Sequence, residues 1–232
     1  MSTTPATPAT PTTPASAGRA AALTATASVP TTAMDRPQPV ILENEHVRLE
    51  PLGPQHVEGL RAVVADGEIW RIPYAPHVPA PEQVAERVAA QCASDEAGST
   101  VSWAVLERDG GRVVGHTTFL NISLRDRRLE LGTTYMAGST HGTGLNAATK
   151  LALLTHAFEE LGCLGVEFRV HHLNITSRRA VERLGAQQDG ILRAHRIMPD
   201  GTIRHTVVYS ILADEWTGVK ASLEHRLHRL RR

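Results

Sequence analysis

The sequence predicts an α+β fold in which helices flank one mixed central sheet. Short segments with strand-type alternation of apolar and polar residues are separated by segments whose apolar residues recur at helical spacing. Asp109-Gly110-Gly111, which lies between two of the strand-like segments, is a hairpin turn signal and makes part of the sheet antiparallel. The predicted order is therefore strand, two helices, three strands, helix, strand, helix and a final pair of strands.

The first half of the domain supplies one strand and two helices before the antiparallel run. A short strand over 47–51 is followed by a helix over 54–65, because Pro54 stands at a helix start and apolar residues then recur on one face. Pro81 likewise begins a helix that continues toward Ala93. The three strand-like segments that follow are Val101 to Glu107, Arg112 to Ile122 and Arg128 to Met136.

The second half alternates between helices and strands. Gly142-Thr143-Gly144 leads into a long helix, and Gly162 is its expected C-terminal stop. A strand over 166–170 follows, and Asn174 is typical of the N-cap of a helix that runs to Leu184. The last hairpin has arms over about 190–197 and 202–212, joined by the turn Pro199-Asp200-Gly201.

We expect three parts along the chain: a tail over 1–37, a folded domain over 38–213, and an amphipathic helix over 214–232. Thr, Pro, Ala and Ser fill 28 of the first 33 positions, so the tail has little to bury and is expected to be disordered. It lacks the basic start and Leu-rich stretch of an export signal. The apolar stripe that begins at Trp216 predicts a helix lying on the domain or on a partner subunit.

Composition excludes several classes of protein. Lys plus Arg and Asp plus Glu both number 24, so the formal net charge is zero and gives no support for nucleic-acid binding. The sequence contains no run of 18 apolar residues, so we expect no membrane-spanning helix. Cys92 and Cys163 have no CxxC partner, so we expect no metal site and a reducing, cytoplasmic location.

The most informative segment is a strand over 129–136 that is followed by the glycine-rich turn His141–Asn146. Glycines let backbone approach an anion, and a helix start exposes unpaired N–H groups, so this pattern favours a pyrophosphate site. A P-loop is excluded because Lys150 lacks the preceding glycine. A dinucleotide fingerprint is matched by Gly142, Gly144 and Ala147, but the antiparallel hairpins around it do not suit that fold. Coenzyme A suits the whole order of elements.

From about Val40 to Leu212 the chain resembles the GNAT superfamily of N-acetyltransferases, and most closely its RimJ/RimL-like branch. The family's pyrophosphate motif, [QR]xxGx[GA], stands here as His141–Asn146, with His in the first position and Asn in the last. Further resemblance lies in the run 127–132 and in Asn174, Ser177 and Leu184-Gly185. The resemblance implies transfer of an acetyl group from acetyl-CoA to a primary amine, either a protein N-terminus or a small molecule.

The resemblance also implies a place for the cofactor. In the family the strand over 128–136 splays away from the strand after the long helix, and the pantetheine arm pairs with the opened edge. Backbone N–H groups near Thr133, Thr134 and Tyr135 would then hold the thioester carbonyl, and Asn174 would bind the arm. The expected pyrophosphate residues are His141, Gly142, Thr143, Gly144, Leu145 and Asn146.

The family reaction is direct attack of the amine, without an acyl-enzyme. Many relatives protonate the leaving thiolate with a tyrosine at the position of Val181, so Ser177 is the candidate acid here. Glu130 is the candidate base, and an ion pair with Arg127 or Arg128 is the alternative reading of its carboxylate. Rival bases are His116, His171 and His172.

The acceptor side is expected to use Trp70, Tyr74 and His116, although aromatic residues on such a loop are also common core anchors. His195, Arg196, Arg204 and His205 on the last hairpin would favour a substrate with carboxylates, or are a solvated face. Two other functions stay open from the residues: a noncatalytic acyl-CoA-binding regulatory module and a nicotinamide-dependent enzyme. A homodimer is a further possibility, since the family's fold often dimerises.

Overall fold

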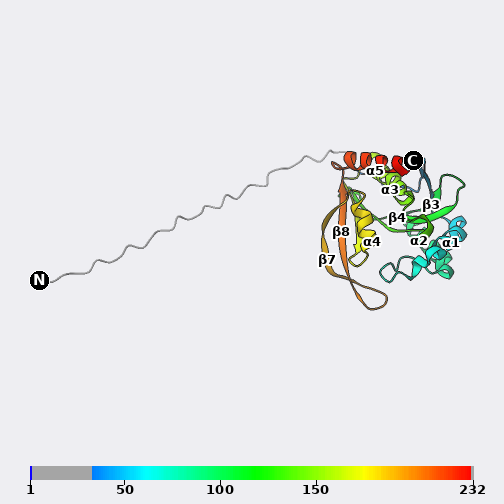
Figure 1. Cartoon of the computed structure of the whole chain (residues 1–232), viewed down its shortest axis with the longest axis horizontal. Coiled ribbons are helices and arrows are strands. Elements are labelled where there is room, and N and C mark those ends of the chain that lie inside the picture. The colour runs from blue at the N-terminus through cyan, green and yellow to red at the C-terminus, as the bar shows by residue number, and fades with distance from the viewer. Residues whose placement is uncertain (2–32, 231–232) are drawn as a thin grey trace. The chain divides into compact units, whose positions relative to one another are not determined.

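The protein is described by a computed structural model over Met1 and residues 33–230, and its domain contains one eight-stranded sheet (Figure 1). The strand order across the sheet is β1-β2-β3-β4-β5-β6-β8-β7, and all neighbours are antiparallel except β5 and β6. The strands are β1 (Leu42–Glu43), β2 (Val47–Pro51), β3 (Val101–Glu107), β4 (Val113–Ser123), β5 (Arg128–Met136), β6 (Gly165–His171), β7 (Gln187–Ile197) and β8 (Ile203–Leu212).

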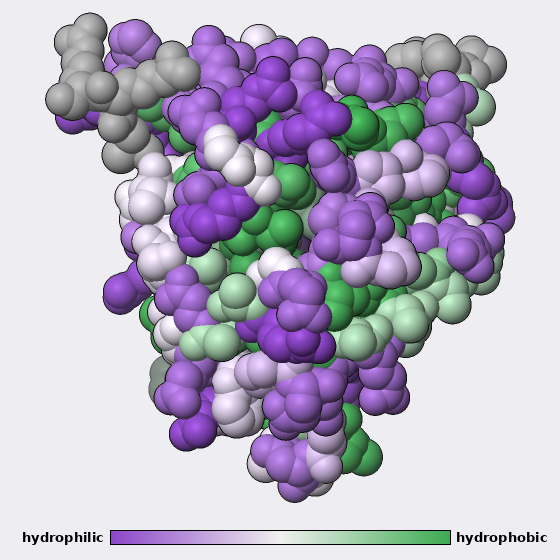
Figure 2. Space-filling view, turned by 90° about the vertical axis from the view of Figure 1, so that its right-hand side faces the viewer, coloured by the Kyte–Doolittle hydropathy of each residue, from purple (hydrophilic) through white to green (hydrophobic). Residues whose placement is uncertain are grey.

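Helices cover the two faces of this sheet in two groups. On one face α1 and α2 build a hydrophobic cluster with the ends of β4 and β5, and on the other α3, α4 and α5 pack over the main core. The side that holds α1 and α2 is turned to the viewer in Figure 2 and is mostly hydrophilic, with hydrophobic residues showing between the charged ones. The helices are α1 (Val57–Ala65), α2 (Val84–Glu96), α3 (Leu145–Thr155), α4 (Ile175–Glu182) and α5 (Trp216–Leu230).

The predicted α+β fold and order of elements are confirmed. The predicted bounds of β3 and β5 coincide with those in the structure, and β4 differs by one residue at each end. Two features are additional. The two-residue strand β1 pairs with β2, and a π-helical turn over His156–Glu160 continues α3 up to the predicted stop at Gly162.

The C-terminal segment forms the helix α5, which lies on its own domain. Trp216 stacks on Phe158 with ring centroids 5.2 Å apart, and its indole N–H donates to Glu159 at 2.7 Å. Three further members of the predicted apolar stripe are buried: Val219, Leu223 and Leu227.

The beginning of the described chain is packed rather than free. Met34 is 4% exposed and Asp35 N–H donates to Leu161 O at 3.2 Å, although both residues fall in the segment predicted to be a disordered tail. Burial of one large apolar side chain among Thr and Pro residues explains this attachment. The rest of that prediction concerns residues 2–32, which lie outside the described part of the chain. None of the described helices is long and apolar enough to cross a membrane.

Candidate active site

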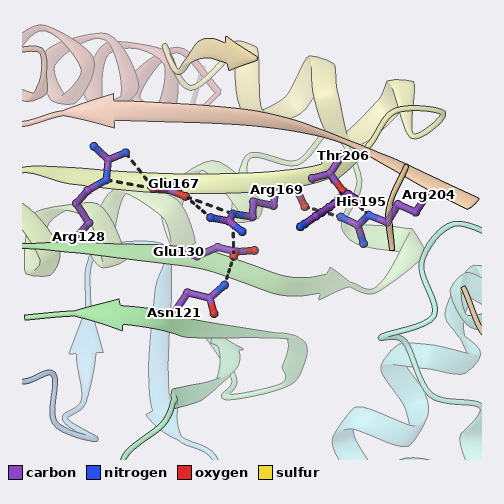
Figure 3. A network of polar contacts seen from close by, with 8 residues as sticks. All are labelled: Asn121, Arg128, Glu130, Glu167, Arg169, His195, Arg204 and Thr206. Carbon is purple, nitrogen blue, oxygen red and sulfur yellow. Dashed lines mark hydrogen bonds and ion pairs between the residues drawn. The ribbon is translucent and has the colours of Figure 1, made fainter. Parts of the chain in front are cut away.

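The parallel strands β5 and β6 stay paired over only three residues each and then separate. The paired positions are Arg128↔Gly165, Leu129↔Val166 and Glu130↔Glu167. Beyond Glu130, β5 continues to Met136 and β6 to His171 without further pairing between them. Figure 3 shows the two strands diverging past Glu130. We call this opening the β5–β6 fork. It leaves main-chain N–H and C=O groups that an extended ligand can pair with as an added strand.

A bulge in β5 lies inside the fork. The register between β4 and β5 shifts between His116 and Thr118, so Thr133 and Thr134 together stand opposite Thr117. Thr133 has φ 45°, which is a strained conformation for a β-branched residue. Strain of this kind persists only where neighbours hold it, and it concentrates at functional sites.

Three side chains from three different elements hold the bulge. His116 on β4 bonds the carbonyl of Thr133 through Nδ1 at 3.2 Å, and His77, from the segment before α2, lies 3.5 Å from the carbonyl of Thr134. Lys150 on α3 donates from Nζ to Thr134 Oγ1 at 2.7 Å. The backbone of the predicted carbonyl-binding residues is thus fixed in place before any ligand arrives.

Lys150 is a residue at the bulge that the sequence analysis did not assign to the site. Its side chain is buried, and burial lowers the pKa of the ammonium to about 7. Lys150 shares no ion pair with a carboxylate in the described part of the chain. The available signal was a lysine on the apolar face of the predicted long helix, one turn and a half after Gly144.

Burial lowers the pKa of His116 to about 4, so its ring is neutral at pH 7 and donates Nδ1–H to the Thr133 carbonyl. This state makes His116 a poor general base and leaves it as a support of the bulge. This observation does not test the acceptor-binding role that we predicted for His116, which stays a prediction.

We expect this histidine to make the fold sensitive to acid. Between pH 6.5 and 4 the unfolded chain binds a proton at this ring and the folded chain does not, so stability falls as pH drops, by up to about 1.4 kcal/mol per pH unit. Urea unfolding of the wild type and of His116→Asn at pH 7, 6 and 5 measures this, because the variant lacks the titrating ring. The exposed His225→Asn is the control, and parallel losses in all three proteins would contradict the assignment.

The turn before α3 has the geometry of an anion cradle. Gly142 has φ 81° and Gly144, the N-cap of α3, has φ 93°, both in the left-handed region that favours glycine. A Cβ on Gly142 would meet nothing within 4 Å, so the backbone there faces open space. The first-turn N–H groups of α3 point from this turn with the positive end of the helix dipole.

Two buried polar atoms near the cradle and fork have no hydrogen-bond partner among the described residues: Thr133 Oγ1 and Asn146 Oδ1. Buried polar atoms are normally satisfied, so each marks a place where a ligand group or water completes the site. These atoms, the glycines and the open strand edges fit an extended cofactor with a diphosphate at one end, as coenzyme A has.

Glu130 lies where the fork begins. Its carboxylate is 7% exposed, accepts a hydrogen bond from Asn121 Nδ2 at 2.6 Å, and lies 3.5 Å from Arg169 Nε (Figure 3). Burial raises the pKa of the Glu130 carboxyl, against the lowering effects of Asn121 and Arg169. The alternative that we weighed was a pair with Arg127 or Arg128. Arg128 pairs instead with Glu167 at 3.0 Å, and Arg127 donates to the main-chain oxygen of Gly162.

The start of α4 lies just past the end of β6, at the open end of the fork. Asn174 is its N-cap, as predicted, and Asn174 Oδ1 accepts from the Ser177 N–H at 3.0 Å. Ser177 is half-buried in the first turn of α4. Val181, which stands where many relatives have a tyrosine, is buried in the main core.

The segment after α1 contacts both strands of the fork. Tyr74 lies 5.8 Å from His171 on β6, measured between ring centroids, while His77 reaches the β5 bulge. Tyr74 therefore lies beside β6, and its role in acceptor binding stays a prediction. Trp70 packs against the α1–α2 cluster under the guanidinium of Arg71, 4.8 Å from the ring centroid, and its role in acceptor binding also stays a prediction.

Metal-binding clusters and other cavities were also considered as candidate sites in the described part of the chain. No group of three or more His, Cys, Asp or Glu side chains in residues 33–230 is placed to hold a metal ion. A groove of about 790 Å³ lies elsewhere, between Arg36–Pro39 and α2, and contains none of the predicted site residues.

Comparison with known proteins places the chain in a family. The model of the acetyltransferase (GNAT) domain matches residues 46–187. The chain belongs to the GNAT acetyltransferase family. The predicted family and the prediction of an acyltransferase are thereby confirmed.

Three relatives of this GNAT protein match it over nearly their whole length. It is 25% identical over 173 residues to the uncharacterized N-acetyltransferase YoaA of Bacillus subtilis (strain 168), a match that covers 74% of this chain and 96% of YoaA. An acetyltransferase-like chain of T. thermophilus is 39% identical with a TM-score of 0.71, covering 82% of this chain and 98% of that one. Mycobacterium smegmatis RimJ, solved with CoA-disulfide, shares the fold at a TM-score of 0.66 and 20% identity, covering 81% and 95% of the two chains.

Proposed function

We propose that this GNAT protein transfers the acetyl group of acetyl-CoA to a primary amine by direct attack of the amine on the thioester. The observation that carries the proposal is the β5–β6 fork with the strained bulge at Thr133 inside it and the glycine cradle at the start of α3. An acceptor amine reaches the fork from the face that carries Glu130.

The cofactor is bound at two ends in this proposal. Backbone N–H groups of the α3 start, between Gly142 and Asn146, bind the diphosphate, and the exposed edge of β5 pairs with the pantetheine arm. The bulge then presents N–H groups at Thr133–Tyr135 to the thioester oxygen, where negative charge develops during attack. Asn174, which caps α4, and Asn146, whose Oδ1 lacks a partner among the described residues, flank the arm.

Proton transfer is divided between two side chains. Glu130 accepts a proton from the acceptor ammonium, directly or through water, and its raised pKa brings it closer to the pKa of an amine. The neutral amine attacks the carbonyl carbon and the C–S bond breaks. The thiolate takes a proton from Ser177, and the proton that the acylated nitrogen loses returns to the Ser177 oxygen. Trp70, Tyr74 and His116 remain the proposed acceptor-side residues, of which Tyr74 and His116 are the two that contact the walls of the fork.

One observation favours a second candidate function, a noncatalytic acyl-CoA-binding module. The position of the family tyrosine is a valine that the main core buries, and the pyrophosphate motif begins with His141. Release of free CoA thiol from acetyl-CoA, measured over a panel of primary amines, separates the two functions. The transferase proposal predicts release that depends on an amine and on Ser177 and Glu130, whereas binding of acetyl-CoA without turnover on any amine would overturn it.

We expect Gly142→Ala to weaken acetyl-CoA binding about tenfold, because the added Cβ occupies the open space through which the diphosphate approaches the backbone. Isothermal titration with acetyl-CoA measures the loss. Gly110→Ala is a matched control, since Gly110 also has a positive φ, 83°, and open space around it, but lies in the hairpin turn between β3 and β4. Equal affinity in the two variants would contradict the placement of the diphosphate.

A further inference from the structure

The sheet face that carries Glu130 also carries a guanidinium without a carboxylate partner in the described part of the chain, that of Arg204. Residues paired across antiparallel strands share a face, and His171 pairs with Thr206 while Arg169 pairs with Val208. Side chains alternate along a strand, so Arg204 and Thr206 on β8 lie on the same face as Arg169 on β6 and Glu130 on β5.

Within residues 33–230, the hydrogen bonds of Arg204 go to neutral groups. Its Nε donates to Thr206 Oγ1 at 2.9 Å and its Nη2 donates to the main-chain oxygen of Arg169 at 3.1 Å. The side chain is half-buried, and burial, followed by the nearby charge of Arg196, lowers the pKa of the guanidinium, while the charge of Glu130 acts in the opposite direction. A positive charge that is partly removed from water and faces a second positive charge needs a compensating anion.

The neighbouring carboxylates are already engaged. Glu167 pairs with Arg128 and Arg169, both at 3.0 Å, and Glu130 is bound by Asn121. On the hairpin, Asp200 accepts from the N–H and hydroxyl of Thr202, and Asp189 accepts from the hydroxyl of Ser210. Among the described residues no carboxylate is left to pair with Arg204, so its charge is available to a bound ligand.

Arg204 and Glu130 both contact Arg169. Arg204 bonds the main chain of Arg169, and Glu130 faces the side chain of Arg169, so a positive and a negative group stand on either side of it (Figure 3). A guanidinium fork matches the two oxygens of a carboxylate, while Glu130 suits an ammonium. The pair is therefore complementary to a molecule that carries both charges.

We propose that the acceptor is a small amine that also carries a carboxylate, which Arg204 binds while the ammonium turns toward Glu130. This inference rests on the proposed function and names its substrate class. Amines with several positive charges, such as aminoglycosides, are repelled by Arg196 and Arg204 and are poor acceptors.

Matched acceptors test the proposal with the whole protein. The series consists of straight-chain ω-amino acids of two to six carbons and their carboxamides, at saturating acetyl-CoA, with kcat/KM corrected for the fraction of free amine. We expect the best amino acid to exceed its amide by about 10- to 100-fold, the range of one charge-assisted hydrogen-bond pair. Arg204→Gln should remove this preference through KM, leaving the amides and the KM for acetyl-CoA unchanged, and Arg204→Lys should keep part of it.

The control variant is Arg193→Gln, which removes an exposed arginine from β7. Equal rates for acids and amides in the wild type, or an unchanged preference in a folded Arg204→Gln, would overturn the inference while the transferase function stands. Preference for polycationic amines would overturn it as well. If no amine of any charge is acetylated, the proposed function itself fails. The wild-type series decides the question even where the variant does not fold.

Discussion

Glu130→Gln is expected to lower kcat/KM for amine acetylation by about 100- to 1000-fold at neutral pH, the usual contribution of a positioned general base. The variant keeps the hydrogen-bonding shape of the side chain at the start of the fork but cannot accept the ammonium proton. Because an α-amine has a reference pKa of about 8, the free amine becomes abundant at higher pH without help from the protein. The gap between variant and wild type should therefore narrow as pH rises.

The measurement is a profile of kcat/KM against pH for both proteins. Wild-type activity should fall at low pH through a pKa above the ordinary value of a glutamate, since burial raises that of Glu130, and the variant should lack this step. Glu167→Gln is the matched control: it removes a carboxylate paired directly across from Glu130 and should cost far less. A constant ratio of the two rates at every pH would show that Glu130 holds structure rather than moves a proton.

Lys150→Met is expected to change how stability depends on pH. The pKa of Lys150 is about 7 in the folded protein against 10.5 for an ordinary lysine. Between these values the unfolded chain binds the proton and the folded chain does not, so the unfolding free energy of the wild type rises with pH, by up to about 1.4 kcal/mol per unit. Below pH 7 both states hold the proton and the slope disappears. The variant has no such group.

Urea unfolding at pH 6, 7, 8 and 9 gives the difference in unfolding free energy between Lys150→Met and the wild type. We expect the unfolding free energy of Lys150→Met, relative to that of the wild type, to be highest at pH 6 to 7 and to decline steadily at higher pH. Lys220→Met is the matched control, since the ammonium of Lys220 lies beside Glu159 near the surface. If the difference in unfolding free energy from the wild type changed with pH in the same way for both variants, a buried and readily deprotonated Lys150 would be contradicted.

The sequence was sufficient to predict the fold because the residues that end its helices and strands act locally. Asp109-Gly110-Gly111 separates two strands whose bounds need no long-range information, and Gly162 marks the end of the long helix even though the last turn is π-helical. Apolar spacing alone does not distinguish a π turn from an α turn, so that feature was not predicted. Burial of Met34 depends on a contact with Cys163, far along the chain, and was likewise not predicted.

The sequence pointed to candidate site residues but not to the residues that contact them. Glu130 was a candidate because of its strand, yet its contact with Arg169 depends on which residues of β5 and β6 pair, and sequence does not reveal that register. His77 and Lys150 reach the bulge from separate elements, so neither lies near it in sequence. Tyr74 and Trp70 looked equivalent as loop aromatics, and only the packing separates them.

A crystal structure of the protein with acetyl-CoA tests the central claim most directly. The account predicts the pantetheine arm hydrogen-bonded along β5 inside the β5–β6 fork, the thioester oxygen at the Thr133 bulge, and the diphosphate on the backbone of Gly142–Asn146. A fork closed by direct pairing of β5 with β6 in the complex, or a diphosphate in the groove beside α2, would contradict it.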